Sequence, residues 1–329
     1  MSFLPLDAPR GQIVATVTGE SVVLCPELAR AGATAFRLNA SHLEPEALRR
    51  ATETIRASLP DAPIVVDLQG AKLRLGSFAE RTVVAGETLR FALAPRTSRE
   101  VSLPHPEVFA AVAVGDTLSC DDDRLRFKIR AVTPDSLEAA VLQGGPLRPR
   151  KGLNVVEHPV ELSDLTGADQ VRLQAVGDVP GLAFAFSFMK DGRETTWLRS
   201  RVPGATVVGK VERAEAIANL TLIDVSTSAV WICRGDLGAQ LGMAALAKFV
   251  ADLTPVALRQ PVLMAGQVLE HLTEHSEPTR SEVCHLFDLS RRGYAGIVLS
   301  DETAIGRHPV RAVETAAGLL ASFRTASAL

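Results

Sequence analysis

Aromatic residues are scarce in this chain, making up only 5% of its 329 residues. The core must therefore be built from aliphatic side chains, and hydrophobic residues do reach 47% of the chain. Neither sign of charge dominates, since 35 basic and 38 acidic residues give a net charge of -3. A balanced charge provides no polyelectrolyte attraction, so we expect neither a nucleic-acid partner nor binding to a membrane surface.

Cysteine is also rare, and the spacing of its four residues excludes several kinds of site. No two cysteines form a CxxC pair, which argues against a disulfide framework and a zinc site. The N-terminal segment carries no signal-peptide pattern, because Asp7 and Arg10 interrupt it early. No apolar run approaches the roughly eighteen residues of a membrane span. We therefore expect a cytoplasmic protein.

The chain does have a regular alternation of short apolar runs with amphipathic helical patterns. Apolar runs of this length are typical of buried parallel strands. Eight strands are expected, at 12–17, 33–38, 63–68, 182–187, 205–210, 229–234, 261–265 and 295–299. Helical patterns lie at 44–58, 212–219, 243–256, 267–274 and 279–292. Eight such units favour a closed (β/α)8 TIM barrel, with a doubly wound open sheet as the alternative.

One long interval breaks this alternation between the third and fourth strands. It holds β-type segments at 82–91, 116–120, 124–133 and 137–142, separated by Pro, Gly and Asp. We predict a small β-barrel domain, 75–156, inserted after the third strand as a lid, between barrel parts 1–74 and 157–329. Within the insert, Asp121, Asp122 and Asp123 are expected to form a solvated turn.

Charged residues directly follow two of the expected strands. Lys210 and Glu212 end one apolar run, and Arg234 and Asp236 end the next. In a parallel α/β protein, residues just past the strands lie at the carboxyl edge, where ligands bind. Two carboxylates and two cations at this edge are the groups that a divalent metal and a phosphorylated anion require.

Other strand ends add charge to the same rim, namely Arg37, Asp67, Lys72 and Arg74. Phosphoryl transfer needs such a cluster, because carboxylates hold Mg²⁺ and cations neutralise the oxygens of the group in flight. Mg²⁺ usually takes one or two protein carboxylates, and Glu212 and Asp236 would supply two.

Taken singly, these residues also have simpler structural interpretations. Arg37 and Asp67 alone would be a rim salt bridge. Asn39, Ser41 and His42 suit a turn that leads into the next helix, since Ser and Asn favour such positions. The functional interpretation depends on several charged residues falling at strand ends together.

Taken in order, these segments resemble the pyruvate kinase family through nearly the whole chain. The segments that carry the resemblance are RLNASH (37–42), DLQGAKLRLG (67–76), GDTLSCDDDRLRFKI (115–129), GGPLRPRKGLN (144–154), FAFSFMK (184–190), GKVERAEAI (209–217), ICRGDLG (232–238), PVLMAGQVLEHLTEHSEPTRSE (261–282) and IVLSDETAIGRHPVRAV (297–313). The resemblance implies a magnesium-dependent phosphotransferase of glycolysis that acts between phosphoenolpyruvate, or a related enol phosphate, and ADP.

The resemblance also implies roles for individual residues. Lys210 would contact the transferring phosphoryl group and Arg37 would hold the phosphate, while Glu212 and Asp236 would bind Mg²⁺ or Mn²⁺. The implied substrate-binding residues are Gly235, Asp236, Gly266 and Ser187, with the backbone at a helix start receiving the substrate carboxylate. The implied nucleotide-binding residues are His42, Arg74 and Lys151.

A monovalent-cation site is implied by the same resemblance, at Asn39, Ser41, Asp67 and Leu68. Lys72 stands where many members of the family carry glutamate. Members with lysine at this position resemble the present chain, and in them the ammonium stands in for potassium. Lys72 is therefore counted with the catalytic residues, and K⁺ is not expected to be required.

Among the departures from the family pattern, two bear directly on function. Gly266 replaces a threonine whose hydroxyl helps to orient the substrate carboxylate and the proton delivered to the enolate. The sequence also ends after the eighth unit, so we expect the C-terminal regulatory domain to be absent. A homo-oligomer formed through the barrel is compatible with the sequence.

Three functions are compatible with these observations. The first is a pyruvate kinase-like phosphotransferase. The second is a metal-dependent enzyme, of the lyase class, that acts on a pyruvate-type enolate. The third is a non-catalytic, pyruvate kinase-like binding protein. Retention of Lys210, Glu212 and Asp236 favours the first, because a binding protein has no physical need for such a charge cluster.

Overall fold

The computed structural model describes residues 11–121, 123–158, 160–162 and 164–326. The chain divides into two compact units, one made of Met1–Gly70 with Asp164–Leu329 and the other of Ala71–Ser163.

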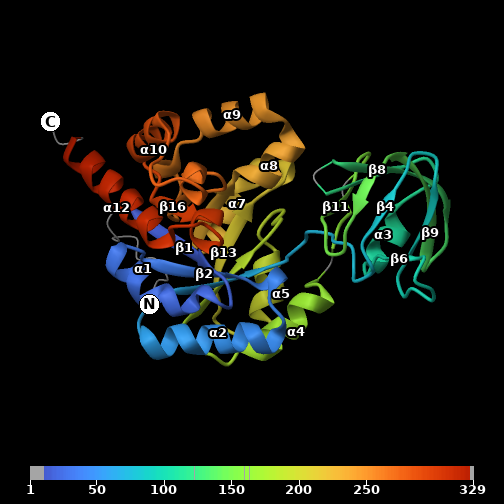
Figure 1. The fold of residues 1–329 in the computed structure, drawn as a ribbon, viewed down its shortest axis with the longest axis horizontal. Helices are drawn as coiled ribbons and strands as arrows, with labels where there is room; N and C mark the ends of the chain where they lie inside the picture. The colour runs from blue at the N-terminus through green and yellow to red at the C-terminus, as the bar shows by residue number, and fades with distance from the viewer. Residues whose placement is uncertain (1–10, 122, 159, 163, 327–329) are drawn as a thin grey trace. The chain divides into compact units, whose positions relative to one another are not determined.

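The first unit is a closed barrel of eight parallel strands (Figure 1). Its strands are β1 (Gln12–Val17), β2 (Ala35–Asn39), β3 (Ile64–Leu68), β12 (Leu182–Phe186), β13 (Thr206–Val211), β14 (Ala229–Cys233), β15 (Val262–Ala265) and β16 (Gly296–Leu299). Around the barrel they follow the order β1-β16-β15-β14-β13-β12-β3-β2, and β1 pairs with β2 to close it. The expected (β/α)8 barrel is confirmed, and the open sheet is excluded.

Helices connect these strands and surround the barrel (Figure 1). The α-helices are α1 (Cys25–Ala31), α2 (Pro45–Ser58), α4 (Gly167–Val176), α5 (Glu194–Arg199), α6 (Ala214–Ala218), α7 (Leu220–Ser226), α8 (Arg234–Leu241), α9 (Met243–Asp252), α10 (Arg280–Arg292), α11 (Asp301–Ala304) and α12 (Pro309–Ala326). The described part of this unit also contains four short 3-10 helices, η1 (Ser21–Leu24), η2 (Ala40–His42), η3 (Pro255–Ala257) and η4 (Glu270–Thr273).

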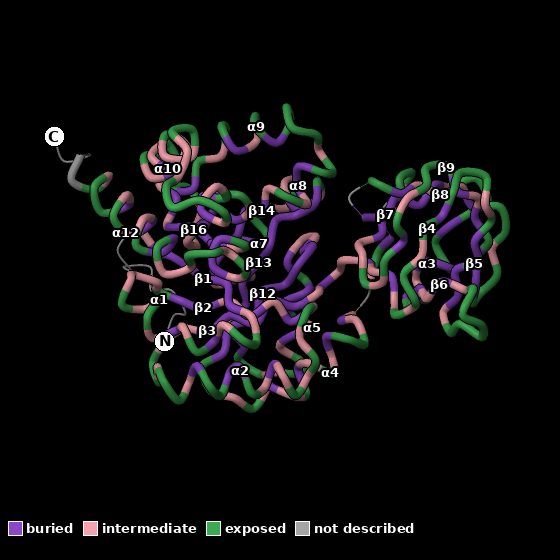
Figure 2. The backbone as a smooth tube through the Cα atoms, in the orientation of Figure 1, coloured by how far each residue is buried: buried purple, intermediate pink, exposed green. Residues whose placement is uncertain are grey.

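Local sequence explains where the longer helices begin and which face they bury. In α2, Pro45 stands at the first helical position, and Leu48, Ala51 and Ile55 repeat at helical spacing on the buried face. In α10, Thr279 and Glu282 form a capping box that satisfies the free N–H groups of the first turn. Figure 2 shows the result, with buried strands inside and exposed outer faces on the surrounding helices.

One expected helix, 267–274, is wrong for half of its length. Only Glu270–Thr273 is helical, as the short η4. Gln267 has a left-handed backbone with φ of 53°, and the N–H of Leu269 donates to the distant Glu302 carboxylate at 3.1 Å. A left-handed residue at the start prevents a regular helix from forming there.

The second unit is an inserted β domain after β3. Its elements are β4 (Arg81–Val83), β5 (Thr88–Ala92), β6 (Val101–Ser102), α3 (Pro106–Ala111), β7 (Thr117–Cys120), β8 (Leu125–Val132), β9 (Ser136–Gln143), β10 (Gly145–Leu147) and β11 (Leu153–Val155). Six strands form one sheet, in the order β11-β7-β8-β9-β5-β6, and β10 pairs with β4 in a second. The segment 82–91 is thus two strands, divided by a turn at Gly86.

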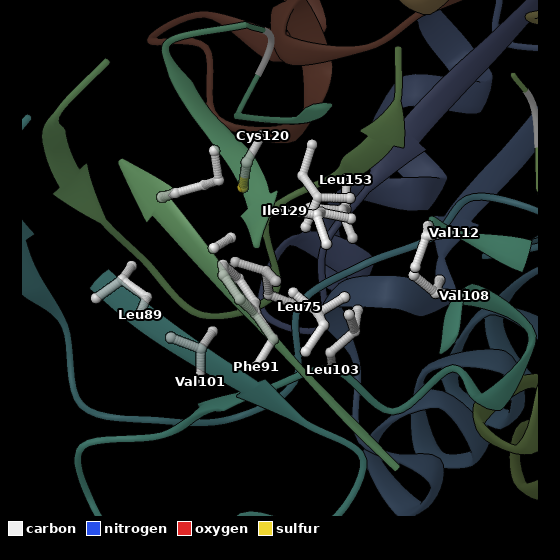
Figure 3. Packing of buried hydrophobic residues seen from close by; sticks show 14 of the residues in the cluster. Leu75, Leu89, Phe91, Val101, Leu103, Val108, Val112, Cys120, Ile129 and Leu153 are labelled. Atoms are coloured by element: carbon white, nitrogen blue, oxygen red, sulfur yellow. The ribbon is translucent and has the colours of Figure 1, made fainter. Parts of the chain in front are cut away.

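The insert has its own hydrophobic core (Figure 3). Leu75, Leu103 and Leu153 contribute to this cluster, and Phe91 packs edge-on against Phe127 with ring centroids 5.3 Å apart. Among the described residues of the whole chain, no helix is long and apolar enough to span a bilayer.

Candidate active site

A layer of polar side chains continues the apolar interior of the barrel toward the carboxyl ends of its strands. The interior cluster takes residues from every barrel strand. Side chains alternate along a strand, so the residue two positions after an interior residue faces the same way. On several strands this next residue is polar, and among these residues Thr16, Arg37, Asp67, Ser187 and Lys210 follow Val14, Ala35, Val65, Ala185 and Val208.

Lys210 lies at the centre of this layer. Its Nζ is 3.1 Å from Asp67 Oδ2 and 3.0 Å from Glu212 Oε1, and it donates to Ser187 Oγ at 2.8 Å. The residue is only 7% exposed. Burial by itself lowers the pKa of Lys210, but the carboxylates of Asp67 and Glu212 outweigh burial, and the pKa is raised. The ammonium is therefore a fixed positive charge at neutral pH.

Arg37 shares the Asp67 carboxylate with Lys210. Its Nε and Nη2 each lie 2.6 Å from Asp67 Oδ2, and its Nη1 donates to Thr16 Oγ1 at 3.0 Å. Burial raises the pKa of Asp67, but Lys210 and Arg37 outweigh burial, and the pKa is lowered. The salt bridge of the simpler interpretation exists, yet it belongs to a buried network. Thr16 was missed as a site residue, although its position two residues after Val14 would have identified it.

The two expected metal ligands come just after neighbouring strands. β13 and β14 pair at Val211 and Ile232, so Glu212 and Asp236 follow adjacent strand ends. Glu212 is 3% exposed, and its Oε2 accepts the N–H of Phe188 at 2.8 Å. The described residues contain no group of three or more His, Cys, Asp or Glu that could hold a metal. Carboxylates are ligands that Mg²⁺ accepts, with substrate oxygens and water filling the rest of its octahedron. The metal-binding role of Glu212 and Asp236 stays a prediction.

Gly266 packs against the start of α8, where the substrate carboxylate is expected. Its φ is +84°, and an added Cβ would lie 3.3 Å from the backbone N of Gly235. Gly235 itself is exposed, and Asp236 follows it in the first turn of the helix. A helix N-terminus offers unsatisfied N–H groups to an anion. The structure thus brings Gly235 and Gly266 together, while their substrate-binding role stays a prediction.

A buried carboxylate holds the loop that follows β3. Asp169 accepts the N–H groups of Gln69 and Gly70, each at 2.9 Å, and the Thr166 hydroxyl at 3.0 Å. Burial raises the pKa of Asp169 to about 6, against the lowering effect of these hydrogen bonds. Gly70 approaches the residue that follows β12 so closely that a Cβ would lie 2.1 Å from Ser187 O. Asp169 therefore fixes the loop after β3 beside Ser187. No local pattern in the sequence predicted this role for Asp169.

The residues equated with a monovalent-cation site make local hydrogen bonds. Asn39 Oδ1 accepts the N–H of Ser41 at 3.2 Å and caps η2, which is the turn of the simpler interpretation. Leu68 is buried, and its carbonyl accepts the Ser187 hydroxyl at 2.8 Å. His42 is exposed at the end of η2. The cation-site and nucleotide roles of these residues stay predictions.

Lys72, Arg74 and Lys151 belong to the second unit. A Cβ on Gly152 would lie 3.0 Å from Lys72 Cε, and Arg74 Nη1 donates to the carbonyl of Arg150 at 3.0 Å. Their catalytic and nucleotide-binding roles also stay predictions.

The expected solvated turn at Asp121–Asp123 is wrong at its first residue. Asp121 is buried and has a φ of 53°. Its Oδ1 lies 2.9 Å from Lys151 Nζ, so the carboxylate neutralises that ammonium. Asp123 pairs with Arg126 at 2.6 Å, while Asp122 lies outside the described residues.

Comparison with known proteins identifies the family. Residues 8–313 match the family model described as pyruvate kinase, barrel domain. The chain belongs to the pyruvate kinase family. It is 32% identical over 324 residues to a pyruvate kinase of Methylorubrum extorquens, covering 93% of this chain and 67% of that protein. It is 31% identical over 333 residues to a pyruvate kinase of Mycobacterium tuberculosis, covering 93% and 68%.

A solved structure from the same family shares the fold. The crystal structure of a pyruvate kinase from Cryptosporidium parvum superposes with a TM-score of 0.76 at 22% identity. The alignment covers 96% of this chain and 70% of that one. The chain thus spans about two thirds of the length of the pyruvate kinases that it matches.

Proposed function

We propose that the protein transfers a phosphoryl group between phosphoenolpyruvate, or a related enol phosphate, and ADP, with Mg²⁺ or Mn²⁺ bound. The observation that carries this proposal is the buried ammonium of Lys210. It lies within 3.1 Å of two carboxylates and is held on a rigid strand end. Family membership supports the reaction class, since the similar proteins are named pyruvate kinase.

In this proposal, the residues of the barrel rim hold the substrate and balance its charge. The phosphorus–oxygen bond to the enol breaks as a β-phosphate oxygen of ADP bonds to phosphorus. Lys210 and Arg37 would neutralise the equatorial oxygens of the group in transit, a fixed electrostatic stabilisation. The N–H groups at the start of α8, at Gly235 and Asp236, would receive the substrate carboxylate. Glu212 and Asp236 would hold the metal, which supplies positive charge to the phosphoryl and enolate oxygens when bound.

The enolate left by this transfer must gain a proton on carbon to become pyruvate. Gly266 has no side chain to contribute to that step, and its left-handed backbone disfavours one. This observation favours a second candidate function, a metal-dependent enzyme that acts on a pyruvate-type enolate by other chemistry.

The test combines phosphoenolpyruvate, ADP and Mg²⁺ in a buffer without potassium and follows pyruvate and ATP. We expect turnover, and we expect Lys210→Met to reduce kcat by about 100-fold or more, because a preorganised charge is lost. Lys248→Met is the matched control, since Lys248 is exposed on α9 and forms an ion pair with Asp252 of the same helix. Lys210→Arg keeps the charge and checks that lost activity does not reflect unfolding.

The three functions give different outcomes in this experiment. Pyruvate and ATP formed together, and lost in Lys210→Met, support phosphoryl transfer. Magnesium-dependent pyruvate binding without ATP formation would refute the transfer and support the enolate enzyme. Failure to bind pyruvate or phosphoenolpyruvate with Mg²⁺ would refute both.

A further inference from the structure

Arg234, the first residue of α8, contacts a histidine from another helix. Its Nη1 lies 2.8 Å from Nε2 of His285, which belongs to α10. Arginine nitrogens can only donate, so Nε2 must be the acceptor of this hydrogen bond. The ring is therefore neutral with its proton on Nδ1, because an imidazolium would place a second donor and a second positive charge there. Burial and Arg234 together lower the pKa of His285, which favours the neutral ring.

The other nitrogens of the Arg234 guanidinium bind a turn after β15. Nε and Nη2 donate to the carbonyl of Gly266 at 2.9 and 2.6 Å, and Nη2 also donates to the carbonyl of Gln267 at 2.6 Å. A planar guanidinium presents its N–H groups as a rigid fork. Fixing one side of the group at His285 therefore fixes the direction of the bonds on the other side.

The turn that Arg234 holds needs outside support. Gly266 and Gln267 have φ values of 84° and 53°, so two consecutive residues are left-handed. Glycine adopts this conformation readily, but glutamine does so at a cost that the surrounding structure must offset. The three hydrogen bonds from Arg234 provide that support.

The supported turn forms one wall of the candidate carboxylate site. Gly266 lies so close to Gly235 that an added Cβ would stand 3.3 Å from its backbone N. A shift of the turn would therefore change its position relative to the N–H groups at the start of α8, which are expected to bind the carboxylate. The chain of contacts runs from His285 through Arg234 to Gly266, and ends at the start of α8.

We infer that His285 is a positioning residue of the active site, a neutral acceptor that fixes Arg234 and, through it, the left-handed turn at Gly266–Gln267. The inference rests on the proposed function only for the identity of the ligand, a small carboxylate such as pyruvate. Besides Arg234 on α8, the charged groups that act on the ring are Asp288 and Arg292 of α10 itself.

The structural test compares crystal structures of two variants and a control at pH 7.5. His285→Gln keeps an acceptor near the place of Nε2, whereas His285→Leu removes it. Cys284→Ala is the matched control, an exposed neighbour on the same helix. We expect the left-handed turn in His285→Gln and Cys284→Ala and a changed turn or a displaced Arg234 in His285→Leu. An unchanged Arg234 and turn in His285→Leu would overturn the inference whether or not the protein is a phosphotransferase.

The binding test measures pyruvate with Mg²⁺ by calorimetry between pH 5.5 and 8. A hydrogen bond to a charged group is lost in His285→Leu, so we expect roughly tenfold weaker binding than in wild type and His285→Gln. Wild-type affinity should fall toward the acidic end of this range as the ring takes up a proton, and His285→Gln should lack this fall. Equal affinities in His285→Leu and wild type, or the same pH profile in His285→Gln, would overturn the inference. Wild type that binds no pyruvate would refute the proposed function alone, because the crystal structures still decide the role of His285.

Discussion

Asp169 makes the stability of the barrel depend on pH in an unusual direction. Burial raises its pKa from 3.8 to about 6, so the folded state binds a proton more tightly than the unfolded chain does. A raised pKa in the folded state contributes stability that is fully present below pH 3.8 and lost as the pH rises through 6. The difference of about two units corresponds to at most about 3 kcal/mol, at 1.36 kcal/mol per unit.

Asp169→Asn isolates this contribution from those of other groups. The amide keeps one acceptor oxygen, so it can satisfy only one of the two N–H groups of Gln69 and Gly70, at a cost of about 1–3 kcal/mol at any pH. The variant does not titrate. The stability advantage of wild type over Asp169→Asn should therefore be larger at pH 4.5 than at pH 7.5, and it should shrink by about 2 kcal/mol over that range.

Urea unfolding followed by tryptophan fluorescence measures this difference, because Trp197 and Trp231, the chain's two tryptophans, both lie in the barrel unit. The experiment needs free energies of unfolding for both proteins at several pH values. An advantage of wild type that grows with pH would refute the reasoning. It would mean that the three hydrogen bonds to the carboxylate outweigh its burial.

Three further substitutions test other parts of the site. Asp67→Asn leaves Lys210 and Arg37 buried without their shared carboxylate, so urea unfolding should show a loss of about 3–5 kcal/mol; a loss below 1 kcal/mol would contradict the buried network. Lys72→Glu should make any phosphotransferase activity depend on K⁺, whereas the unsubstituted protein should show equal rates in sodium and potassium buffers. Strong activation of the unsubstituted protein by K⁺ would exclude a role for Lys72 as the resident cation. Gly266→Thr forces a side chain into a left-handed, crowded position, so the free energy of unfolding should fall by about 1–2 kcal/mol from backbone strain, plus the cost of shifting its neighbour. This loss should exceed that of Gly204→Thr, because Gly204 has a similar φ of 74° but open surroundings. Equal losses of stability in the two variants would show that the contact with α8 is unimportant.

Much of the barrel could be predicted because its units are locally encoded. Each strand is a short apolar run, and the expected range 229–234 differs from the observed Ala229–Cys233 by one residue. The expected helix 44–58 likewise begins one residue early, before Pro45. The segment 267–274 could not be assigned correctly, because its conformation depends on partners far along the chain, Glu302 for Leu269 and Arg234 for Gln267.

The sequence by itself determined the order of the strands and the residues at their carboxyl ends, because alternating apolar runs and parallel crossovers leave few other arrangements. It therefore predicted Lys210, Glu212, Arg37 and Asp67 as members of one rim. Only the tertiary structure decided how they share their charges. Asp67 forms ion pairs with two cations, Arg37 and Lys210. This arrangement requires side chains from three separate strands to reach the same level of the barrel.

The partners of the residues that support the site also depend on the tertiary structure. Asp169 binds backbone groups about a hundred positions earlier in the chain, and His285 reaches Arg234 from a different helix. A carboxylate or an imidazole on a helix gives no sign in the sequence of which buried donor it will meet. That choice is made by packing, because a polar group taken out of water must find its partner among the residues that the fold places beside it.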